Sequence, residues 1–298
     1  MTQQKLYYGI IIIKNVIEGL YIMITNFDKK PILWISVLFS IIIFFTGCGT
    51  VGNQSSSSSS QDSQTAQVGQ PRAEVKKTVV ELVPGTPYTS KAYIYESVIE
   101  GPTVMVVGGI HGNEPAGSLA ASKFMEIPVL RGKLIVIPRA NNVALDANER
   151  TLPEIEDLNR AYPGKSDGTP AERLTYDIVQ LMKKYQVAMV LDLHEGYAFN
   201  AVDHKSVGET ILPGTDDTSA LLAMDAVEHI NKQITEAKKK FSVLANPIVG
   251  STVHYANTVL KVPAFTVETS SDQPLEDRVN FSFEIAKFLV SSQGVIDK

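Results

Sequence analysis

The sequence is poor in the side chains that most often bind metals. Cys48 is the only cysteine among 298 residues, so no disulfide can form within one chain. A zinc site built from several cysteines is excluded for the same reason. The sequence also has only five histidines. Any metal ion held by this chain must therefore be bound by histidine and carboxylate side chains.

Common nucleotide-binding patterns and excess positive charge are missing as well. The glycines around Gly108 do not follow the G-x-G-x-x-G spacing of a dinucleotide site. Gly164-Lys165-Ser166 ends like a phosphate-binding loop, but Asn159 stands where the first glycine of such a loop is required. The formal net charge is −5, and a surface of that sign repels phosphate backbones. We therefore expect no nucleic-acid partner.

The chain begins with a segment that is typical of secretion. Residues 31–47 form an apolar run that follows Lys29 and Lys30 and leads directly into Cys48. A basic start, a short apolar core and small residues at its end indicate a secretory signal. The ending FTGC resembles a bacterial lipobox, which implies that Cys48 is lipidated and becomes the mature N-terminus. The alternative is an uncleaved transmembrane helix, since about 17 residues is the lower limit for crossing a bilayer.

Four regions are predicted along the chain. A start at Met23 gives a signal of ordinary length, so residues 1–22 are expected to be an extension from a misassigned start codon and residues 23–47 the signal. Residues 48–73 include six consecutive serines and too few apolar residues to fold, so they are expected to form a flexible tether. Residues 74–298 are long enough for one sizeable core. The predicted location is the cell envelope, with the lipid on the outer side of the cytoplasmic membrane or in the outer membrane.

Apolar, β-branched runs alternate with helix-like stretches in the region that is expected to fold. The expected strands cover residues 92–98, 103–107, 133–137, 187–193 and 264–267, and the expected helices cover residues 115–125, 171–184, 217–236 and 276–291. The strands lack polar alternation, which indicates a sheet covered on both faces. We predict an α/β fold with a mixed, mostly parallel central sheet and helices on both sides.

Three of the expected strands lead directly into polar motifs. Residues 103–107 precede GGIHGNEPAG, residues 187–193 precede HEG, and residues 264–267 precede ETS. In an open α/β sheet the ligand crevice lies beyond the carboxyl ends of the strands. We therefore expect polar side chains that are distant in sequence to converge at this edge.

The first two motifs provide candidate metal ligands. His111 and Glu114 lie three residues apart across a glycine-rich turn, close enough to share one ion. This pair alone fits a solvated loop better, but His194 lies at the mouth of its strand, on the same side as Asp192, and supports the metal site. Two imidazoles and one carboxylate leave a fourth position open, as in catalytic zinc sites. We predict one Zn²⁺ ion bound by His111, Glu114 and His194.

A third motif, DLNRAYPG, begins at Asp157 and provides candidate substrate ligands. Arg160 carries a planar fork that suits a carboxylate, and Asn159 stands beside it. Arg150 precedes Arg160 by ten residues and suits developing negative charge. In isolation this segment fits a solvated surface turn better.

Four segments, taken in order, carry a family resemblance. GGIHGNEPAG, the DLNRAYPG segment with Arg150 before it, LDLHEG and FTVETS resemble the zinc carboxypeptidase superfamily, most closely its succinylglutamate desuccinylase/aspartoacylase branch. The resemblance extends from about Thr103 to Ser270, and the combination is far more specific than any single motif. The segment GSTVHYANT is more similar to the peptidase side of the superfamily, where it lines the specificity pocket. That likeness implies a substrate contact for Tyr255.

The resemblance also implies a role for individual residues. It places zinc on the three ligands predicted above and makes Glu268 the catalytic carboxylate. Asn159 and Arg160 would bind the carboxylate of the substrate, and Arg150 would help to stabilise the oxyanion. Asp157 would orient a zinc-bound histidine, as partners of metal ligands commonly do.

The predicted function is a zinc-dependent hydrolase that cleaves an amide bond near a free carboxylate, outside the cytoplasmic membrane. Residues 74–298 would be the zinc hydrolase domain, and the substrate a small N-acyl amino acid or a short peptide. The chain would contact the membrane through its lipid anchor. Two alternatives remain open: a surface lipoprotein that binds a metal or ligand without catalysis, and a structural lipoprotein without a metal.

Overall fold

The computed structural model describes residues 74–245 and 247–298. The predicted signal, the tether and Cys48 lie outside these residues, so the four-part division of the chain stays a prediction. Among the described helices, none is both long enough and apolar enough to cross a bilayer.

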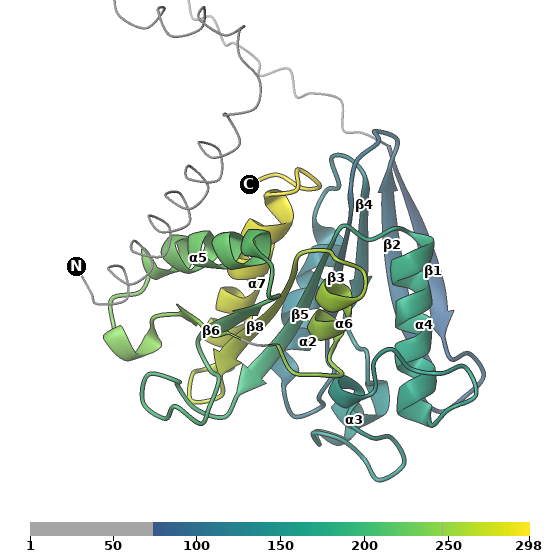
Figure 1. The fold of residues 1–298 in the computed structure, drawn as a ribbon, viewed down its shortest axis with the longest axis horizontal. Coiled ribbons are helices and arrows are strands. Elements are labelled where there is room, and N and C mark those ends of the chain that lie inside the picture. The colour runs from purple at the N-terminus through teal and green to yellow at the C-terminus, as the bar shows by residue number, and fades with distance from the viewer. Residues whose placement is uncertain (1–73, 246) are drawn as a thin grey trace, which may run out of the picture. The chain divides into compact units, whose positions relative to one another are not determined.

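An eight-stranded sheet runs through the described part of the chain, in the order β1-β2-β4-β3-β5-β8-β6-β7 (Figure 1). The strands are β1 Val75–Leu82, β2 Ser90–Ser97, β3 Thr103–Gly108, β4 Lys133–Ile137, β5 Met189–Gly196, β6 Thr210–Pro213, β7 Ser242–Val243 and β8 Ala264–Ser270. The four central strands β4, β3, β5 and β8 are parallel to one another. β1, β2 and β6 make antiparallel pairings, while β7 pairs in parallel with β6. The predicted mixed, mostly parallel sheet is confirmed.

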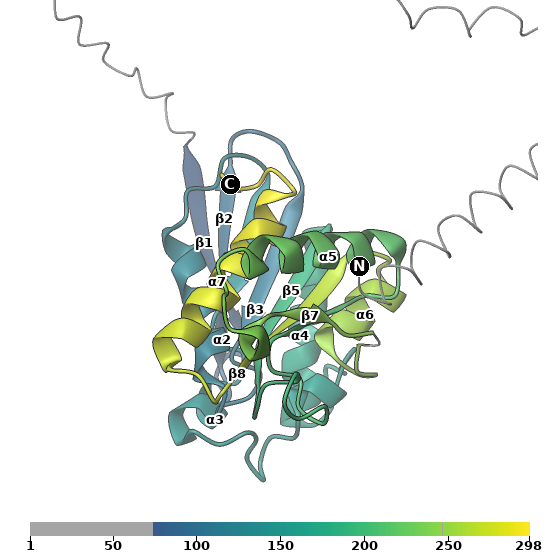
Figure 2. The same cartoon turned by 90° about the vertical axis from the view of Figure 1, so that its left-hand side faces the viewer.

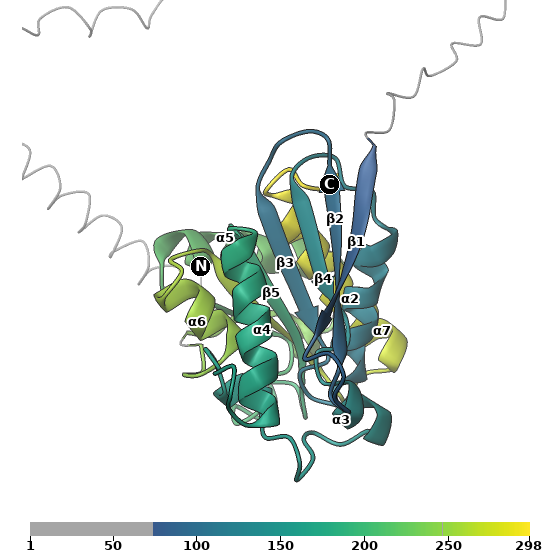
Figure 3. The same ribbon diagram turned by 90° about the vertical axis from the view of Figure 1, so that its right-hand side faces the viewer.

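Helices cover both faces of the sheet, as predicted. They are α2 Pro115–Lys123, α3 Asn142–Ala147, α4 Pro170–Lys184, α5 Asp217–Asn231, α6 Thr252–Thr258 and α7 Leu275–Ser291, with short 3-10 turns η2 Phe124–Glu126, η3 Leu158–Arg160 and η4 Ala237–Lys239. α2, α5 and α7 lie on one face (Figure 2), and α4 and α6 lie on the other (Figure 3). Alternate residues of β3 supply the two cores: Val104 and Val106 face one, and Met105 and Val107 face the other.

Every predicted strand and helix corresponds to an observed one, but the structure adds elements and extends others. The additional elements are β1, β6, β7, α3 and α6. β5 and β8 each continue three residues beyond their predicted ends, to Gly196 and Ser270. His194 and Glu268 therefore lie within paired strands, where the sheet itself fixes their backbone positions.

Candidate metal centre

The loop between β3 and α2 carries the first two predicted ligands. Gly109 has a φ of 70°, in the left-handed region that favours glycine, so the chain turns sharply after β3. A Cβ atom on Gly117 would lie 2.1 Å from the carbonyl oxygen of Leu193, so only glycine lets α2 pack this closely on β5. These two glycines bring His111 and Glu114 beside the end of β5.

The three predicted metal ligands converge on one point. Glu114 lies between the two imidazoles: its Oε1 is 2.8 Å from Nδ1 of His111, and its Oε2 is 2.8 Å from Nδ1 of His194. The centroids of the two imidazole rings are 4.9 Å apart. One ligand atom from each residue lies within 4.8 Å of the other two, and all three residues are buried. One carboxylate and two imidazoles are therefore held together inside the protein.

The ring nitrogens that face away from Glu114 contact aspartates. Nε2 of His111 lies 2.9 Å from Oδ1 of Asp157, and Nε2 of His194 lies 3.2 Å from Oδ1 of Asp192. The Asp157 carboxylate, which hydrogen-bonds to Nε2 of His111, favours a hydrogen on that nitrogen and leaves the Nδ1 lone pair for a metal ion. The contact of Asp192 with His194 is electrostatic, since neither Asp192 oxygen nor Nε2 of His194 makes a hydrogen bond among the described residues. Nδ1 of His111 is buried and, among the described residues, makes no hydrogen bond. The side chains therefore fit one divalent ion such as Zn²⁺, with the two Nδ1 atoms and Glu114 as ligands.

The charges of the cluster favour a cation. Burial alone would raise the pKa of Glu114, but its contacts with His111 and His194 outweigh burial and hold the pKa well below its usual value. Burial also acts to raise the pKa of Asp157, but the contact with His111 dominates and lowers it to about 2. Burial would lower the pKa of His194, yet Asp192 and Glu114 raise it well above 6.5. Ionised Glu114 and Asp157 therefore face the imidazoles, and a metal ion at Nδ1 of His194 would take the place of a proton there.

Glu268 lies next to this cluster on β8. β5 and β8 are parallel neighbours (Figure 1), and their register places Glu268 opposite His194. Glu268 is only 9% exposed, and its Oε2 has no hydrogen-bond partner in the part of the chain that the structure describes. Burial raises its pKa to about 8; His194 opposes this rise, and Glu114 and Asp192 add to it. A buried carboxyl group with an unoccupied oxygen beside a metal site suits proton transfer.

The predicted substrate ligands lie around Asp157. Arg150 donates from Nη1 to Oε1 of Glu114 at 2.8 Å, and its Nη2 lies 3.6 Å from Oδ2 of Asp157. Arg160 donates from Nη1 to the Asn159 carbonyl at 2.8 Å, and the same atom lies 4.0 Å from Oδ2 of Asp157. Asn159 is buried, and its Oδ1 accepts the first backbone N–H of α6 at 3.4 Å. The side chains of both arginines are about half exposed, so a ligand can reach them; their contacts with substrate stay predictions.

Tyr255 lies in the hydrophobic core rather than in the cluster around Glu114. It lies in α6, is 5% exposed, and packs in the hydrophobic core beneath that helix. Like Asn159 and Arg160, it is absent from the lining of the cavity that contains Glu114 and Arg150. Its predicted substrate contact stays a prediction.

A cavity of about 230 Å³ opens beside the cluster. Glu114 and Arg150 form part of its wall, and the loop that follows β5 forms much of the rest. Lys205, in this loop, lines the cavity and makes no ion pair among the described residues, whereas Arg150 and Arg160 both approach Asp157. Lys205 is therefore the cation on the wall that is most available to a ligand. A single lysine in a loop has no characteristic spacing, so the sequence did not indicate it.

Hydrogen bonds hold the loop that carries Lys205 in place. Asp203 accepts from the backbone N–H of Lys205 at 2.9 Å and from the hydroxyl of Tyr197 at 2.8 Å. Ser206 is buried, donates to the Ala198 carbonyl at 2.7 Å and accepts from the Ala198 N–H at 2.9 Å. The backbone of Lys205 is therefore fixed at the cavity rim.

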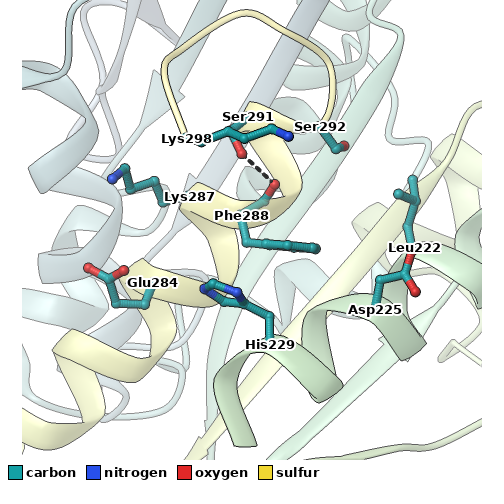
Figure 4. A pocket seen from close by; sticks show the side chains of 9 residues that line it. All are labelled: Leu222, Asp225, His229, Glu284, Lys287, Phe288, Ser291, Ser292 and Lys298. Atoms are coloured by element: carbon teal, nitrogen blue, oxygen red, sulfur yellow. Dashed lines mark hydrogen bonds between the residues drawn. The ribbon is translucent and has the colours of Figure 1, made fainter. Parts of the chain in front are cut away.

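A larger cavity, of about 490 Å³, lies elsewhere, between α5 and α7 (Figure 4). Its wall includes His229, whose ring stacks on Phe288 with 4.7 Å between the ring centroids. None of the predicted catalytic, substrate-binding or metal-binding residues lines it. Its size alone does not make it the reaction site, because it lacks the clustered ligands and buried acid found beside β5 and β8.

An open α/β sheet with this cluster at the ends of its central parallel strands defines a zinc carboxypeptidase-like protein. Residues 100–279 match the Succinylglutamate desuccinylase/Aspartoacylase catalytic domain. The chain belongs to the succinylglutamate desuccinylase/aspartoacylase family, and the predicted family resemblance is confirmed.

Relatives and solved structures agree with this assignment. N-alpha-acetyl-L-2,4-diaminobutyric acid deacetylase of Halomonas elongata is 35% identical over 101 residues, which cover 33% of this chain and 29% of that protein. The mDAP-bound form of Helicobacter pylori Csd4, a D,L-carboxypeptidase, has a TM-score of 0.60 at 24% identity, covering 65% of this chain and 51% of that one. A succinylglutamate desuccinylase/aspartoacylase from Rhodobacter sphaeroides has a TM-score of 0.56 at 17% identity, covering 76% and 68%. The chain thus matches under a third of the deacetylase and about half of Csd4, and the two structural likenesses show a shared fold.

Proposed function

We propose that residues 74–298 hydrolyse an amide bond in a small substrate that carries a free carboxylate, either an N-acyl amino acid or a short peptide, and that Zn²⁺ is the metal. The observation that carries this proposal is the convergence of His111, Glu114 and His194 beside Glu268, whose buried Oε2 is free of hydrogen bonds within the described residues. A protein that only binds metal needs no such acid. The alternative of a non-catalytic binder is therefore less well supported.

Each of these residues has a distinct task in the proposed reaction. A zinc ion held there would polarise the scissile carbonyl and acidify the attacking water. Glu268, which the positive charge of the bound ion would keep ionised despite its burial, accepts the proton of this water and passes it to the departing amine. Arg150 stabilises the negative charge that develops on the carbonyl oxygen. Arg160 and Asn159 hold the free carboxylate and so fix the position of the scissile bond.

The charges on the cavity wall support a substrate with a carboxylate. Lys205 has no carboxylate partner among the described residues, whereas Glu195, on the same wall, is paired with Arg278. Glu114, also on this wall, is paired with Arg150, so the charged group left without a partner there is the cation Lys205. A deacetylase of an N-acetyl amino acid and a D,L-carboxypeptidase, the activities in the names of two proteins similar to this one, also point to such substrates.

A serine-hydrolase mechanism is not favoured. Residues 164–168 read GKSDG and match the G-x-S-x-G spacing of a nucleophile elbow. That elbow requires a sharp turn from a strand into a helix. Here the segment joins η3 to α4, no strand precedes it directly, and Ser166 is exposed.

The test of this function uses the purified protein, zinc and a panel of N-acyl amino acids and short peptides, including cell-wall stem peptides. Glu268→Gln should retain zinc, measured by metal analysis, and lose turnover by about 10²–10⁴-fold, the usual contribution of general acid–base catalysis. Glu284→Gln on α7, which lines the larger cavity, is the matched control and should remain active. Near-normal activity in Glu268→Gln would remove Glu268 from the mechanism.

We also propose that the chain is a lipoprotein of the cell envelope. The support is the signal-like run of residues 31–47 before Cys48 and the serine-rich stretch after it. A labelled fatty acid should be incorporated into the wild-type protein in cells and not into Cys48→Ala. The Cys48→Ala protein should also be lost from the membrane fraction. Equal labelling of the two proteins would contradict lipidation at Cys48.

A further inference from the structure

Helix α2 begins at a metal ligand that does not cap it. Glu114 is the N-cap residue of α2, yet its side chain makes no capping hydrogen bond. Both of its carboxylate oxygens face imidazole nitrogens at 2.8 Å instead. The first N–H groups of a helix lack partners within the helix, and Pro115 at the first position has no N–H. Ala116 therefore has the first N–H of α2 that needs an acceptor from elsewhere.

Glu195 supplies that acceptor. Its Oε1 accepts the Ala116 N–H at 2.6 Å, across 79 residues of sequence. Its own backbone N–H donates to Oε2 of Glu114 at 3.1 Å. One residue thus contacts both the start of the helix and the carboxylate of the metal ligand. Because Glu195 directly follows His194 on β5, it also ties these contacts to the second imidazole.

Arg278 compensates the charge of Glu195. It lies in the first turn of α7, and its Nη1 contacts Oε2 of Glu195. The side chains are 15% and 2% exposed, so little water can replace either partner. Removing one partner of such a pair leaves an uncompensated buried charge. α7, which packs on α2 (Figure 2), is thereby connected to the metal centre through Arg278 and Glu195.

We propose that Glu195, held by Arg278, is a positioning residue that keeps Glu114 oriented toward the metal ion and thereby sets the affinity for zinc. Without Glu195, the Ala116 N–H loses its acceptor, and Glu114, at the N-cap position, is the adjacent carboxylate that can turn back to replace it. That rotation withdraws the carboxylate from the imidazoles. The inference rests on the proposed zinc centre, but it concerns metal affinity rather than the reaction.

The experiment measures Zn²⁺ affinity of the full-length protein by competition with a chelating dye, together with thermal unfolding of the metal-free form. Glu195→Ala should bind zinc about 10–100-fold more weakly, the usual effect of losing a partner of a metal ligand. Glu195→Gln keeps an oxygen that can accept the Ala116 N–H and should recover part of this loss. Asp216→Ala is the matched control, since it removes the carboxylate that caps α5; it should lower the unfolding temperature and leave zinc affinity unchanged.

Three outcomes separate the possibilities. Unchanged zinc affinity in both Glu195 variants would overturn the inference, and so would an equal loss of affinity in Asp216→Ala. If Glu195→Ala does not fold, zinc affinity is compared in Glu195→Gln and Arg278→Lys, since both keep a hydrogen-bonding group at the altered position. Unchanged affinity in both of these variants would then overturn the inference. Zinc affinity is measured without substrate. A wild-type protein that binds zinc but hydrolyses nothing would therefore refute the proposed function and leave the inference about Glu195 standing.

Discussion

Replacing Glu209 by glutamine should stabilise the folded protein at alkaline pH. Glu209 is 2% exposed; its Oε1 accepts the Ser270 N–H at 3.1 Å and Nε2 of Gln273 at 2.6 Å. Its Oε2 is buried without a hydrogen-bond partner among the described residues. Burial raises the pKa of Glu209 from 4.5 to about 7, although these two hydrogen bonds oppose the rise. The folded state therefore favours the neutral carboxyl group.

The sign and size of the effect follow from this shift in pKa. A group whose pKa is higher in the folded state stabilises it fully below the unfolded value, here about 4.5, and loses that contribution as pH rises through about 7. The difference of about 2.5 pH units corresponds to about 3 kcal/mol at 1.36 kcal/mol per unit. Glutamine is neutral at every pH and keeps an oxygen for both N–H donors. Glu209→Gln should therefore gain up to about 3 kcal/mol over the wild type at pH 8.5 and little near pH 4.5.

Urea unfolding followed by far-ultraviolet circular dichroism at several pH values measures this difference. Glu228→Gln on α5, a substitution of the same kind at an exposed position, is the control. Parallel pH profiles for Glu209→Gln and the wild type would refute the reasoning, as would a variant that is less stable at pH 8.5.

Two further predictions concern the cavity and helix α2. Lys205→Met should raise KM for a carboxylate-bearing substrate about tenfold or more and change kcat little, because Lys205 would contact the substrate carboxylate in addition to Arg160 and hydrogen bonds to charged groups contribute about 1.5–3 kcal/mol. Steady-state kinetics with the substrate and its uncharged amide check this, and an equal change in KM for both would contradict it. Gly117→Ala should force α2 away from β5, because its Cβ would lie 2.1 Å from the Leu193 carbonyl oxygen, and should cost about 1–3 kcal/mol of stability and reduce bound zinc. Wild-type unfolding and metal content in that variant would contradict the steric argument.

The central elements were predictable because they are long and buried. β3, β4, β5 and β8 are buried almost throughout. Apolar runs of this kind can be recognised as strands from their own sequence, without knowledge of the neighbouring strands. The elements that were missed are short or polar. β7 has two residues and β6 has four, too few for a period to emerge, and β1 reads VKKTVVEL with most of its residues exposed or half-buried. These strands form through pairing with neighbours rather than through their own pattern.

Some residues of the candidate site could be predicted from the sequence, whereas others depend on how the elements pack. His111, Glu114 and His194 were found from residue type, spacing and place at strand ends, and the alternation along β5 already placed Asp192 on the side of His194. The contacts of Glu195 could not be read from the sequence, because they join residues 79 and 83 positions apart. Only the packing of three elements brings these groups together.

The position of Glu268 depends on the whole sheet rather than on its own motif. A shift of one residue between β8 and β5 would turn Glu268 to the opposite face, away from His194. Two contacts on the other edge of β8 oppose such a shift: the antiparallel register that pairs Thr210 with Glu268, and the hydrogen bond from the Ser270 N–H to Glu209. The short strand β6 and a buried carboxyl group thus hold the register that places Glu268 beside His194, and this placement could not be read from the three letters ETS alone.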